Sequence, residues 1–199
     1  MLPAIGFWFL RHGETDWNAK GLSQGAVDVP LNANGEAQAE RAATLLKSAG
    51  IATIVASPLA RARRTAEMVA AALGLPVSLD PELREVAFAG REGQPLGPWY
   101  DEWVAGIATP MGAESFAELA TRAKCAVTQA LALPAPVLIV SHGALFRALR
   151  AVMGLPVTVR TPNAVPIFCT PPPPAAPEGP WSLRAAGALS LVGDPGISG

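Results

Sequence analysis

The sequence predicts an α/β fold in which a mostly parallel sheet carries helices on both faces. Short apolar runs alternate with longer amphipathic stretches, which is the rhythm of βαβ units. The length of 199 residues suits one domain, and an apolar content of 50% with 16% charged residues supplies a sizeable core. We therefore expect residues 1–199 to form a single domain.

Each expected element follows from its own pattern. Continuous apolar runs predict buried strands, apolar residues at helical spacing predict helices, and Ser115 with Glu118 forms a capping box. The expected strands are Ile5–Leu10, Ala52–Ala56, Pro76–Leu79, Val137–Val140, Val165–Cys169 and Trp181–Ala185. The expected helices are Gly35–Lys47, Leu59–Leu73, Ser115–Leu131 and Ala144–Met153.

Two stretches interrupt this alternation. Residues 91–113 combine proline and glycine with Trp99, Tyr100 and Trp103, which predicts an irregular excursion over the sheet. The four prolines 171–174 fit neither a helix nor a central strand. We expect a surface turn over residues 171–180 between the last two strands, and a linker to a disordered tail is the alternative.

Composition excludes several classes of protein. The chain has 15 Lys and Arg against 16 Asp and Glu, so it lacks the basic excess of a nucleic-acid-binding protein. Cys125 and Cys169 are too few for a disulfide scaffold, and we expect both to be buried in a reducing compartment. No apolar run reaches the ~18 residues of a membrane span, and the first residues lack the basic start of a signal peptide. A cytoplasmic protein without membrane or nucleic-acid partners is expected.

The chain has two histidines, and each follows an apolar strand and precedes a glycine. They stand in Arg11-His12-Gly13 and Ser141-His142-Gly143. Functional groups of open parallel sheets gather beyond the carboxyl ends of strands, and glycine permits a close approach to a ligand. We therefore expect both imidazoles in one functional site at the same edge of the sheet.

The surroundings of His12 favour an anion over a metal ion. Metal sites with two histidines recruit Asp, Glu or Cys, and only Glu14 and Asp16 lie near His12 in sequence. The neighbouring Arg11 repels a divalent metal and attracts an oxyanion. Because consecutive strand residues point to opposite faces, Arg11 and His12 share one pocket only if the strand ends at Leu10. No metal is expected.

A phosphoryl group suits this set of cations. Arg61 stands in the first turn of a predicted helix, where free N–H groups attract anions. With Arg11, Arg61 and a protonated His142 neutralising the phosphoryl charge, His12 attacks phosphorus in line and forms a phosphohistidine. Glu85 follows the third strand and is a candidate general acid for the leaving alkoxide, later a base for water.

Five separated motifs between Phe7 and Arg150 support this interpretation. They are Arg11-His12-Gly13-Glu14-Thr15-Asp16-Trp17-Asn18, Gln24-Gly25…Asp28…Pro30-Leu31…Gly35…Gln38-Ala39, Ser57-Pro58-Leu59…Arg61-Ala62…Thr65-Ala66, Leu83…Glu85…Phe88…Glu92-Gly93 and Val140-Ser141-His142-Gly143. In this order they resemble the histidine phosphatase superfamily, which has the phosphoglycerate mutase-like fold. A G-x-S-x-G elbow, a P-loop and a dinucleotide-binding G-x-G are all absent from the sequence.

The resemblance implies a three-layer α/β/α sandwich and a reaction without metal or nucleotide cofactor. It implies His12 as the phosphorylated nucleophile and Glu85 as the acid and base. The phosphate ligands that it implies are Arg11, Asn18, Arg61 and His142, with Gln24, Gly25 and Gly143 nearby.

The sequence departs from the family pattern at a few positions. Leu22 stands where the family often has a basic residue, Ala89 and Arg91 replace a glycine and a tryptophan, and Ala113 replaces the glycine of Gly-Glu-Ser. Leu22 and Arg91 are expected to alter the substrate entrance, and none of these changes removes a proposed catalytic group.

The expected activity is hydrolysis of a small phosphate ester. Cofactor-dependent mutases resemble this chain but carry an insertion with extra cations, whereas residues 91–113 contain Arg91 as their one cation. A site with little to hold a second anion is expected to release its phosphoryl group to water. A phosphoglycerate mutase and a non-catalytic phospho-ligand binding module are the alternatives. The natural substrate and a homodimeric state stay open, as does whether the aromatic residues of the excursion line the site or form its core.

Overall fold

The computed structural model describes residues 1–187, and residues 188–199, the end of the expected domain, lie outside the described part. A six-stranded sheet has the order β3-β2-β4-β1-β5-β6. Its strands are β1 Phe7–Arg11, β2 Thr53–Ala56, β3 Val77–Leu79, β4 Val137–Ser141, β5 Ile167–Thr170 and β6 Ser182–Ala185. The α-helices are α1 Asp16–Ala19, α2 Ala33–Leu46, α3 Ala60–Leu73, α4 Pro98–Val104, α5 Phe116–Ala130 and α6 Gly143–Val152. Two short 3-10 helices, η1 Pro81–Leu83 and η2 Ala89–Arg91, stand between β3 and α4.

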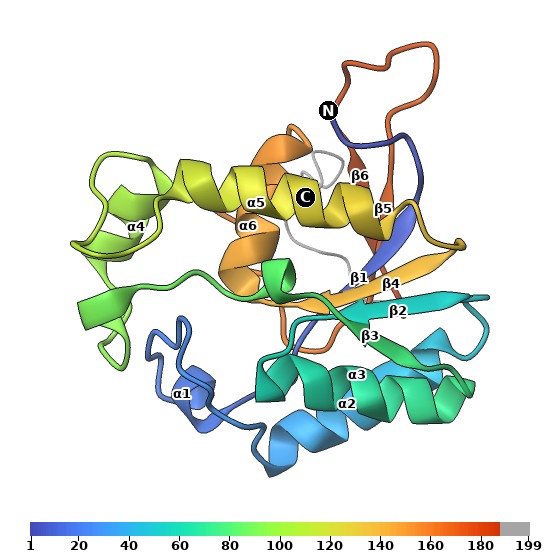
Figure 1. Cartoon of the computed structure of the whole chain (residues 1–199), viewed down its shortest axis with the longest axis horizontal. Helices are drawn as coiled ribbons and strands as arrows, with labels where there is room; N and C mark the ends of the chain where they lie inside the picture. The colour runs from blue at the N-terminus through green and yellow to red at the C-terminus, as the bar shows by residue number, and fades with distance from the viewer. Residues whose placement is uncertain (188–199) are drawn as a thin grey trace, which may run out of the picture.

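The sheet is mixed and mostly parallel, as predicted. Strands β3, β2, β4 and β1 pair in parallel, whereas β5 pairs antiparallel with both β1 and β6. Helices α2 and α3 lie on one side of the sheet and α5 and α6 on the other (Figure 1). This arrangement gives the three layers that the resemblance implies.

The central strands are mostly apolar because both faces of the sheet are buried. Phe7 and Phe9 belong to one core, which they share with apolar residues of α5 and α6. Leu10 belongs to the second core, on the side of α2 and α3. Alternate residues of a strand point to opposite faces, so one short strand contributes to both cores. The carboxyl ends of β1 and β4 are thereby fixed side by side.

The expected strands and the four expected helices are present, with ends shifted by at most two residues. Strand β1 continues to Arg11, one residue beyond the predicted end at Leu10. Arg11 and His12 nevertheless line one pocket, so the condition that the strand end at Leu10 was wrong, because His12 already lies beyond the strand. Ser115 and Glu118 form the predicted capping box at the start of α5. Strands β5 and β6 lie on either side of the four prolines and pair antiparallel, so the chain reverses direction between them.

Two expectations were wrong in part. The excursion over residues 91–113 contains a regular helix, α4, because Pro98 occupies its first turn, where a missing N–H costs nothing. Cys169 is buried as expected, but Cys125 is exposed. Cys125 lies on α5, whose buried residues include Ala123, Ala126 and Val127, so it falls on the other face of that helix.

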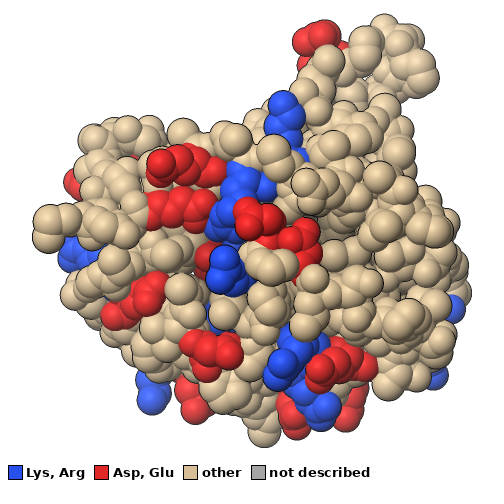
Figure 2. Space-filling view, viewed as in Figure 1, with Lys and Arg blue, Asp and Glu red and all other residues tan. Residues whose placement is uncertain are grey.

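Charged side chains of both signs lie mainly over the left and central parts of the face drawn in Figure 2. On the face drawn in Figure 2, Lys and Arg side chains alternate with Asp and Glu, without one large field of a single sign. None of the helices within residues 1–187 is long and apolar enough to cross a bilayer.

Candidate active site

The two histidines meet at the edge of the sheet where β1 and β4 end. His12 follows β1, His142 follows β4, and Arg11 is paired with Ser141 in the parallel register of these two strands. The ring centroids of His12 and His142 lie 5.3 Å apart, and both residues are buried. The convergence predicted from the two His-Gly sequences is therefore present in the structure.

His12 is held as a neutral imidazole with one nitrogen available. Its Nδ1 lies 2.7 Å from the Gly13 carbonyl oxygen, which only accepts hydrogen bonds, so Nδ1 carries the proton and Nε2 keeps its lone pair. Burial lowers the pKa of His12 well below its ordinary value, and the charges of Arg61 and Arg11 lower it further. A neutral imidazole is the nucleophilic form at neutral pH.

Gly13 keeps this turn close to helix α2. A Cβ atom at Gly13 would stand 2.3 Å from the Gly35 carbonyl oxygen, which is less than any such atom pair tolerates. The Gly13 N–H donates to Thr65 Oγ1 at 3.0 Å. Glycine is therefore required here for the approach of two backbone segments, and this approach fixes the turn that carries His12.

His142 is fully buried and is not among the residues that line the pocket. Its Nε2 is 2.7 Å from Ser57 Oγ, and its Nδ1 is buried without a hydrogen-bond partner. Burial lowers the pKa of His142 well below the usual value, and Arg61, His12 and Arg11 add to this effect. In the absence of an anion, cations and desolvation both favour the neutral ring, so the protonated His142 expected beside a bound phosphoryl group stays a prediction. A bound dianion would favour the protonated form.

Arg11 and Arg61 are buried guanidinium groups on the same pocket. Arg11 donates from Nη1 to the Thr161 carbonyl at 2.7 Å, and Arg61 donates from Nη1 and Nη2 to the carbonyls of Val27 and Gly25, both at 2.8 Å. Burial is the main cause that lowers the pKa of Arg11 to about 10, and nearby Arg160 contributes. The Nε atoms of Arg11 and Arg61 are buried and without partners.

These orphaned groups point to an oxyanion. Among the described residues, four buried side-chain polar atoms lack a hydrogen-bond partner, and three of them are Arg11 Nε, Arg61 Nε and His142 Nδ1. A buried polar group without a partner costs about 1–3 kcal/mol, so their concentration around His12 is characteristic of a ligand-binding site. A phosphoryl group offers the acceptor oxygens that they require.

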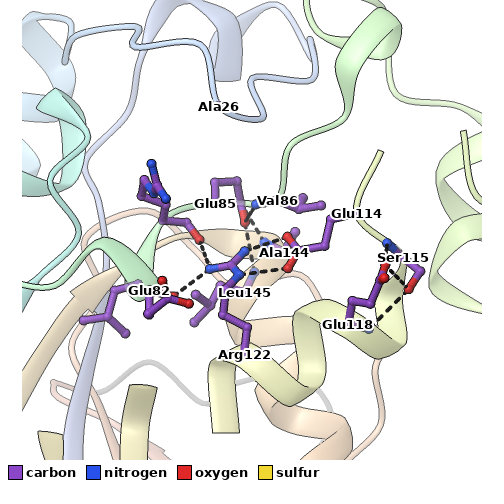
Figure 3. A network of polar contacts seen from close by, with 12 residues as sticks. Ala26, Glu82, Glu85, Val86, Glu114, Ser115, Glu118, Arg122, Ala144 and Leu145 are labelled. Atoms are coloured by element: carbon purple, nitrogen blue, oxygen red, sulfur yellow. Dashed lines mark hydrogen bonds and ion pairs between the residues drawn. The ribbon is translucent and has the colours of Figure 1, made fainter. Parts of the chain in front are cut away.

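The Glu85 carboxylate lies at the start of helix α6. Its Oε2 accepts from Ala144 N at 2.9 Å and its Oε1 from Leu145 N at 3.0 Å (Figure 3). Helix α6 has no side-chain cap from its own N-cap residue, so the Glu85 carboxylate satisfies these free N–H groups. Glu85 lines the pocket together with His12, so the predicted acid and the predicted nucleophile share one cavity.

The other predicted ligands also line this pocket, in different ways. Asn18 Oδ1 accepts from Thr15 N and from Asn163 Nδ2, and Gln24 Oε1 accepts from Thr15 Oγ1 at 2.9 Å. The Gly25 carbonyl is used to hold Arg61. Gly143 begins α6, and a Cβ there would lie 3.2 Å from Arg11 Nε. Apart from His142, every predicted site residue lines the pocket.

The structure adds pocket residues that the sequence analysis missed. Arg147 on α6 and Arg160 in the loop before β5 both line the pocket. The signal for Arg147 was available, since it stands four residues after Gly143, on the same face of a helix. No local pattern, by contrast, identified Arg160.

Of the aromatic residues in the excursion, some line the pocket and others pack in the hydrophobic core. Tyr100 lines the pocket, as does Phe88. Trp103 is completely buried in the core, and Trp99 packs edge-on against Phe88. Arg91 donates to Gln94 and lies over the Trp99 ring, outside the pocket lining, whereas Leu22 is part of it. The expected effect on the entrance therefore applies to Leu22 and not to Arg91.

The residues present do not form a metal site within the described part of the chain. No group of three or more His, Cys, Asp or Glu side chains gathers there in a way that could hold a metal ion. The four pocket arginines make the same place favourable for anions.

Comparison with known proteins agrees with this geometry. A family model described as "Histidine phosphatase superfamily (branch 1)" matches residues 7–163. This chain belongs to the histidine phosphatase superfamily. A protein of Yersinia enterocolitica named "Probable phosphoglycerate mutase GpmB" is 42% identical over 162 residues, which cover 75% of each chain.

Solved structures of other superfamily members share the fold. A mycobacterial glucosyl-3-phosphoglycerate phosphatase, determined with VO3, superposes with a TM-score of 0.78 at 30% identity, covering 89% of this chain and 96% of that one. The protein TTHB049 from Thermus thermophilus superposes with a TM-score of 0.70 at 34% identity, covering 82% of this chain and 92% of that one. The superfamily therefore includes relatives with phosphatase names and relatives with mutase names.

Proposed function

We propose that this histidine phosphatase superfamily member is a metal-independent phosphomonoesterase that hydrolyses a small phosphorylated metabolite. The observation that supports it most is the available Nε2 of a neutral His12, together with three buried side-chain nitrogens without partners, on Arg11, Arg61 and His142. His12 Nε2 attacks phosphorus, the P–O bond to the leaving group breaks, and Arg11, Arg61 and His142 neutralise the transferred group.

Glu85 handles the proton in both halves of the reaction. In its acid form it protonates the leaving alkoxide, and the resulting carboxylate then takes a proton from the water that attacks phosphohistidine. Water becomes the acceptor, inorganic phosphate leaves, and His12 and Glu85 return to their starting states. The bond from Nδ1 to the Gly13 carbonyl keeps the His12 ring oriented throughout.

The first test is phosphate release from p-nitrophenyl phosphate without added metal. We expect His12→Ala to abolish release, and EDTA to leave the wild-type rate unchanged. Rapid quenching with a labelled substrate should trap one phosphoryl group per chain, labile to acid and absent from His12→Ala. Turnover that survives His12→Ala, or that EDTA removes, would contradict the mechanism. Binding of phosphate without any turnover would indicate a binding module instead.

A phosphoglycerate mutase is the second candidate, and the 42% identical relative with that name favours it. A mutase uses the same phosphohistidine but returns the phosphoryl group to a bound hydroxyl. Interconversion of 2- and 3-phosphoglycerate, primed with the bisphosphate, would identify it. Our proposal expects net phosphate release to exceed this interconversion.

A further inference from the structure

Ser57 directly follows β2 and is fully buried, and its side chain contacts the His142 ring. Its backbone N–H donates to the Val140 carbonyl at 3.0 Å, since β2 and β4 are neighbouring parallel strands. His142 directly follows β4, so the two side chains meet beyond the carboxyl ends of these strands. Ser57 Oγ lies 2.7 Å from His142 Nε2.

The hydrogen bonds around the Ser57 hydroxyl determine where its proton lies. The Leu59 N–H donates to Ser57 Oγ at 3.3 Å, so this contact uses a lone pair of the oxygen and not its proton. Within residues 1–187, Ser57 Oγ has one further hydrogen-bond partner, His142 Nε2. The hydroxyl proton is therefore donated to Nε2, which accepts it as an unprotonated nitrogen.

This contact selects between the two neutral forms of the His142 ring. Burial and the nearby Arg61 guanidinium lower the pKa of His142, so the ring of the free protein is neutral. If Nδ1 carries the ring proton, Nε2 accepts from Ser57, and one buried donor, the Nδ1–H, lacks a partner. If Nε2 carries the proton, both the Ser57 hydroxyl proton and the Nδ1 lone pair are buried without partners. Because each buried polar group without a partner is costly, the form with the proton on Nδ1 is favoured.

We propose that Ser57 is a positioning residue that holds the proton of neutral His142 on Nδ1 and thereby presents an N–H donor to the phosphoryl group. This inference rests on the proposed phosphatase function, because it concerns how His142 binds the transferred group. An N–H donor attracts a phosphoryl oxygen, whereas the Nδ1 lone pair of the other neutral form would repel it. The donor is therefore present before an anion binds and before the ring takes up a second proton.

The position of the proton can be measured directly, because the chain has two histidines. In protein labelled with nitrogen-15 in histidine, the ring signals that disappear in His142→Gln belong to His142. At about pH 8, above the ordinary histidine pKa, we expect a protonated Nδ1 and an unprotonated Nε2 in the free wild type. A protonated Nε2, or chemical shifts averaged between the two forms, would overturn the proposal.

Ser57→Ala tests whether the hydroxyl fixes this form of the ring. We expect its His142 shifts to move toward those of a protonated Nε2, while the His12 shifts stay unchanged because a backbone carbonyl holds that ring. Ser141→Ala is the matched control, since its hydroxyl is equally buried but donates to a backbone carbonyl and not to an imidazole. Unchanged His142 shifts in Ser57→Ala, or an equal change in Ser141→Ala, would overturn the positioning role. If Ser57→Ala does not fold, the wild-type spectrum still decides the proposal.

Phosphate binding tests the consequence for the site. Calorimetry with inorganic phosphate should give a Kd about threefold to tenfold higher for Ser57→Ala than for the wild type. In a His142→Gln background the same substitution should have no further effect, because Ser57 acts through His142. An equal loss of affinity in both backgrounds would overturn the inference and leave the phosphatase intact. If the wild type binds phosphate but releases none from any phosphate ester, the proposed function fails, and the ring shifts and the binding cycle still decide the inference.

Discussion

Glu85 combines helix capping with a proposed catalytic role. Its carboxylate accepts hydrogen bonds from two N–H groups of α6, and these bonds fix its position beside the pocket. In the proposed mechanism the same side chain donates a proton to the leaving group. The two roles can be separated by substitution.

Glu85→Gln separates the proton from the hydrogen bonds. The amide oxygen still accepts one N–H of α6, but the side chain no longer donates a proton to the leaving group. We expect kcat on an alkyl phosphate to fall by about 10²–10⁴-fold. Hydrolysis of p-nitrophenyl phosphate should fall much less, since nitrophenolate leaves as an anion. An equal loss on both substrates would exclude Glu85 as the acid.

Ala89 stores backbone strain where the family pattern has glycine. Its φ is +50°, in the left-handed region that glycine adopts without a Cβ penalty. We expect Ala89→Gly to raise the free energy of unfolding by about 0.5–1 kcal/mol, because relief of strain exceeds the added chain entropy. Urea denaturation measures this change. Gly90→Ala is a matched control, since a Cβ at Gly90 meets no atom within 4 Å and its φ is not positive. A loss of stability in Ala89→Gly would contradict the strain.

At the scale of elements, Arg122 on α5 holds the segment that precedes Glu85. It forms two hydrogen bonds with the Glu114 carboxylate, at 2.8 and 2.7 Å, and donates to the carbonyls of Glu82 and Arg84 (Figure 3). Ser141 Oγ donates to the carbonyl between them, at Leu83. Three consecutive carbonyls are thereby fixed immediately before the acid, so Arg122 is a positioning residue.

Arg122→Gln should lower kcat more than it raises KM, because Glu85 acts mainly in the transition state. The loss should be larger on an alkyl phosphate than on p-nitrophenyl phosphate, as for Glu85→Gln but smaller. We also expect the free energy of unfolding to fall by about 2 kcal/mol. Arg63→Gln removes an exposed ion pair with Glu67 and is the control. It should change the free energy of unfolding by no more than about 0.5 kcal/mol and leave kcat unchanged. A pure loss of stability with unchanged leaving-group dependence would reject the positioning role.

The elements and the site differ in how far sequence could predict them. Strands β1 and β4 were predictable because their runs are apolar on both faces, and the glycines after His12 and His142 marked the turns. Helix α4 was missed because its proline and glycine neighbours hide a helix whose apolar face packs on Phe88. Arg160 was missed because its loop reaches the pocket through the Arg11 bond to Thr161, a contact between residues 150 positions apart.

The fold as a whole buries the two imidazoles of His12 and His142. Two cores flank the sheet, and the loop before β5 closes over the end of β1, where Asn163 Nδ2 donates to the His12 carbonyl at 2.9 Å. Strands β5 and β6 follow the residues that the family model matches, and β5 pairs with β1 along its other edge. The site therefore depends on segments from both ends of the described chain.

Burial of the two imidazoles makes the stability of the fold depend on pH. Burial lowers the pKa of both His12 and His142 in the folded state, whereas an unfolded histidine titrates near ~6.5. As pH falls below that value, the histidines of the unfolded chain bind protons, whereas those of the folded chain do not. The free energy of unfolding therefore decreases until the pH falls below the folded pKa values. Above the unfolded pKa this contribution is fully present.

Urea denaturation between pH 8 and pH 5 should therefore show a falling free energy of unfolding. Other groups also contribute to this curve, so the wild type is compared with His142→Gln. The difference between their free energies of unfolding at each pH isolates the contribution of one imidazole. We expect the variant to lose less stability over this range, since glutamine has no proton to take up. Saturating inorganic phosphate should flatten the wild-type curve, because an anion beside the rings raises their folded pKa. Parallel curves for the two proteins would mean that His142 titrates alike in the folded and unfolded states, which its burial against Arg61 and Arg11 does not permit.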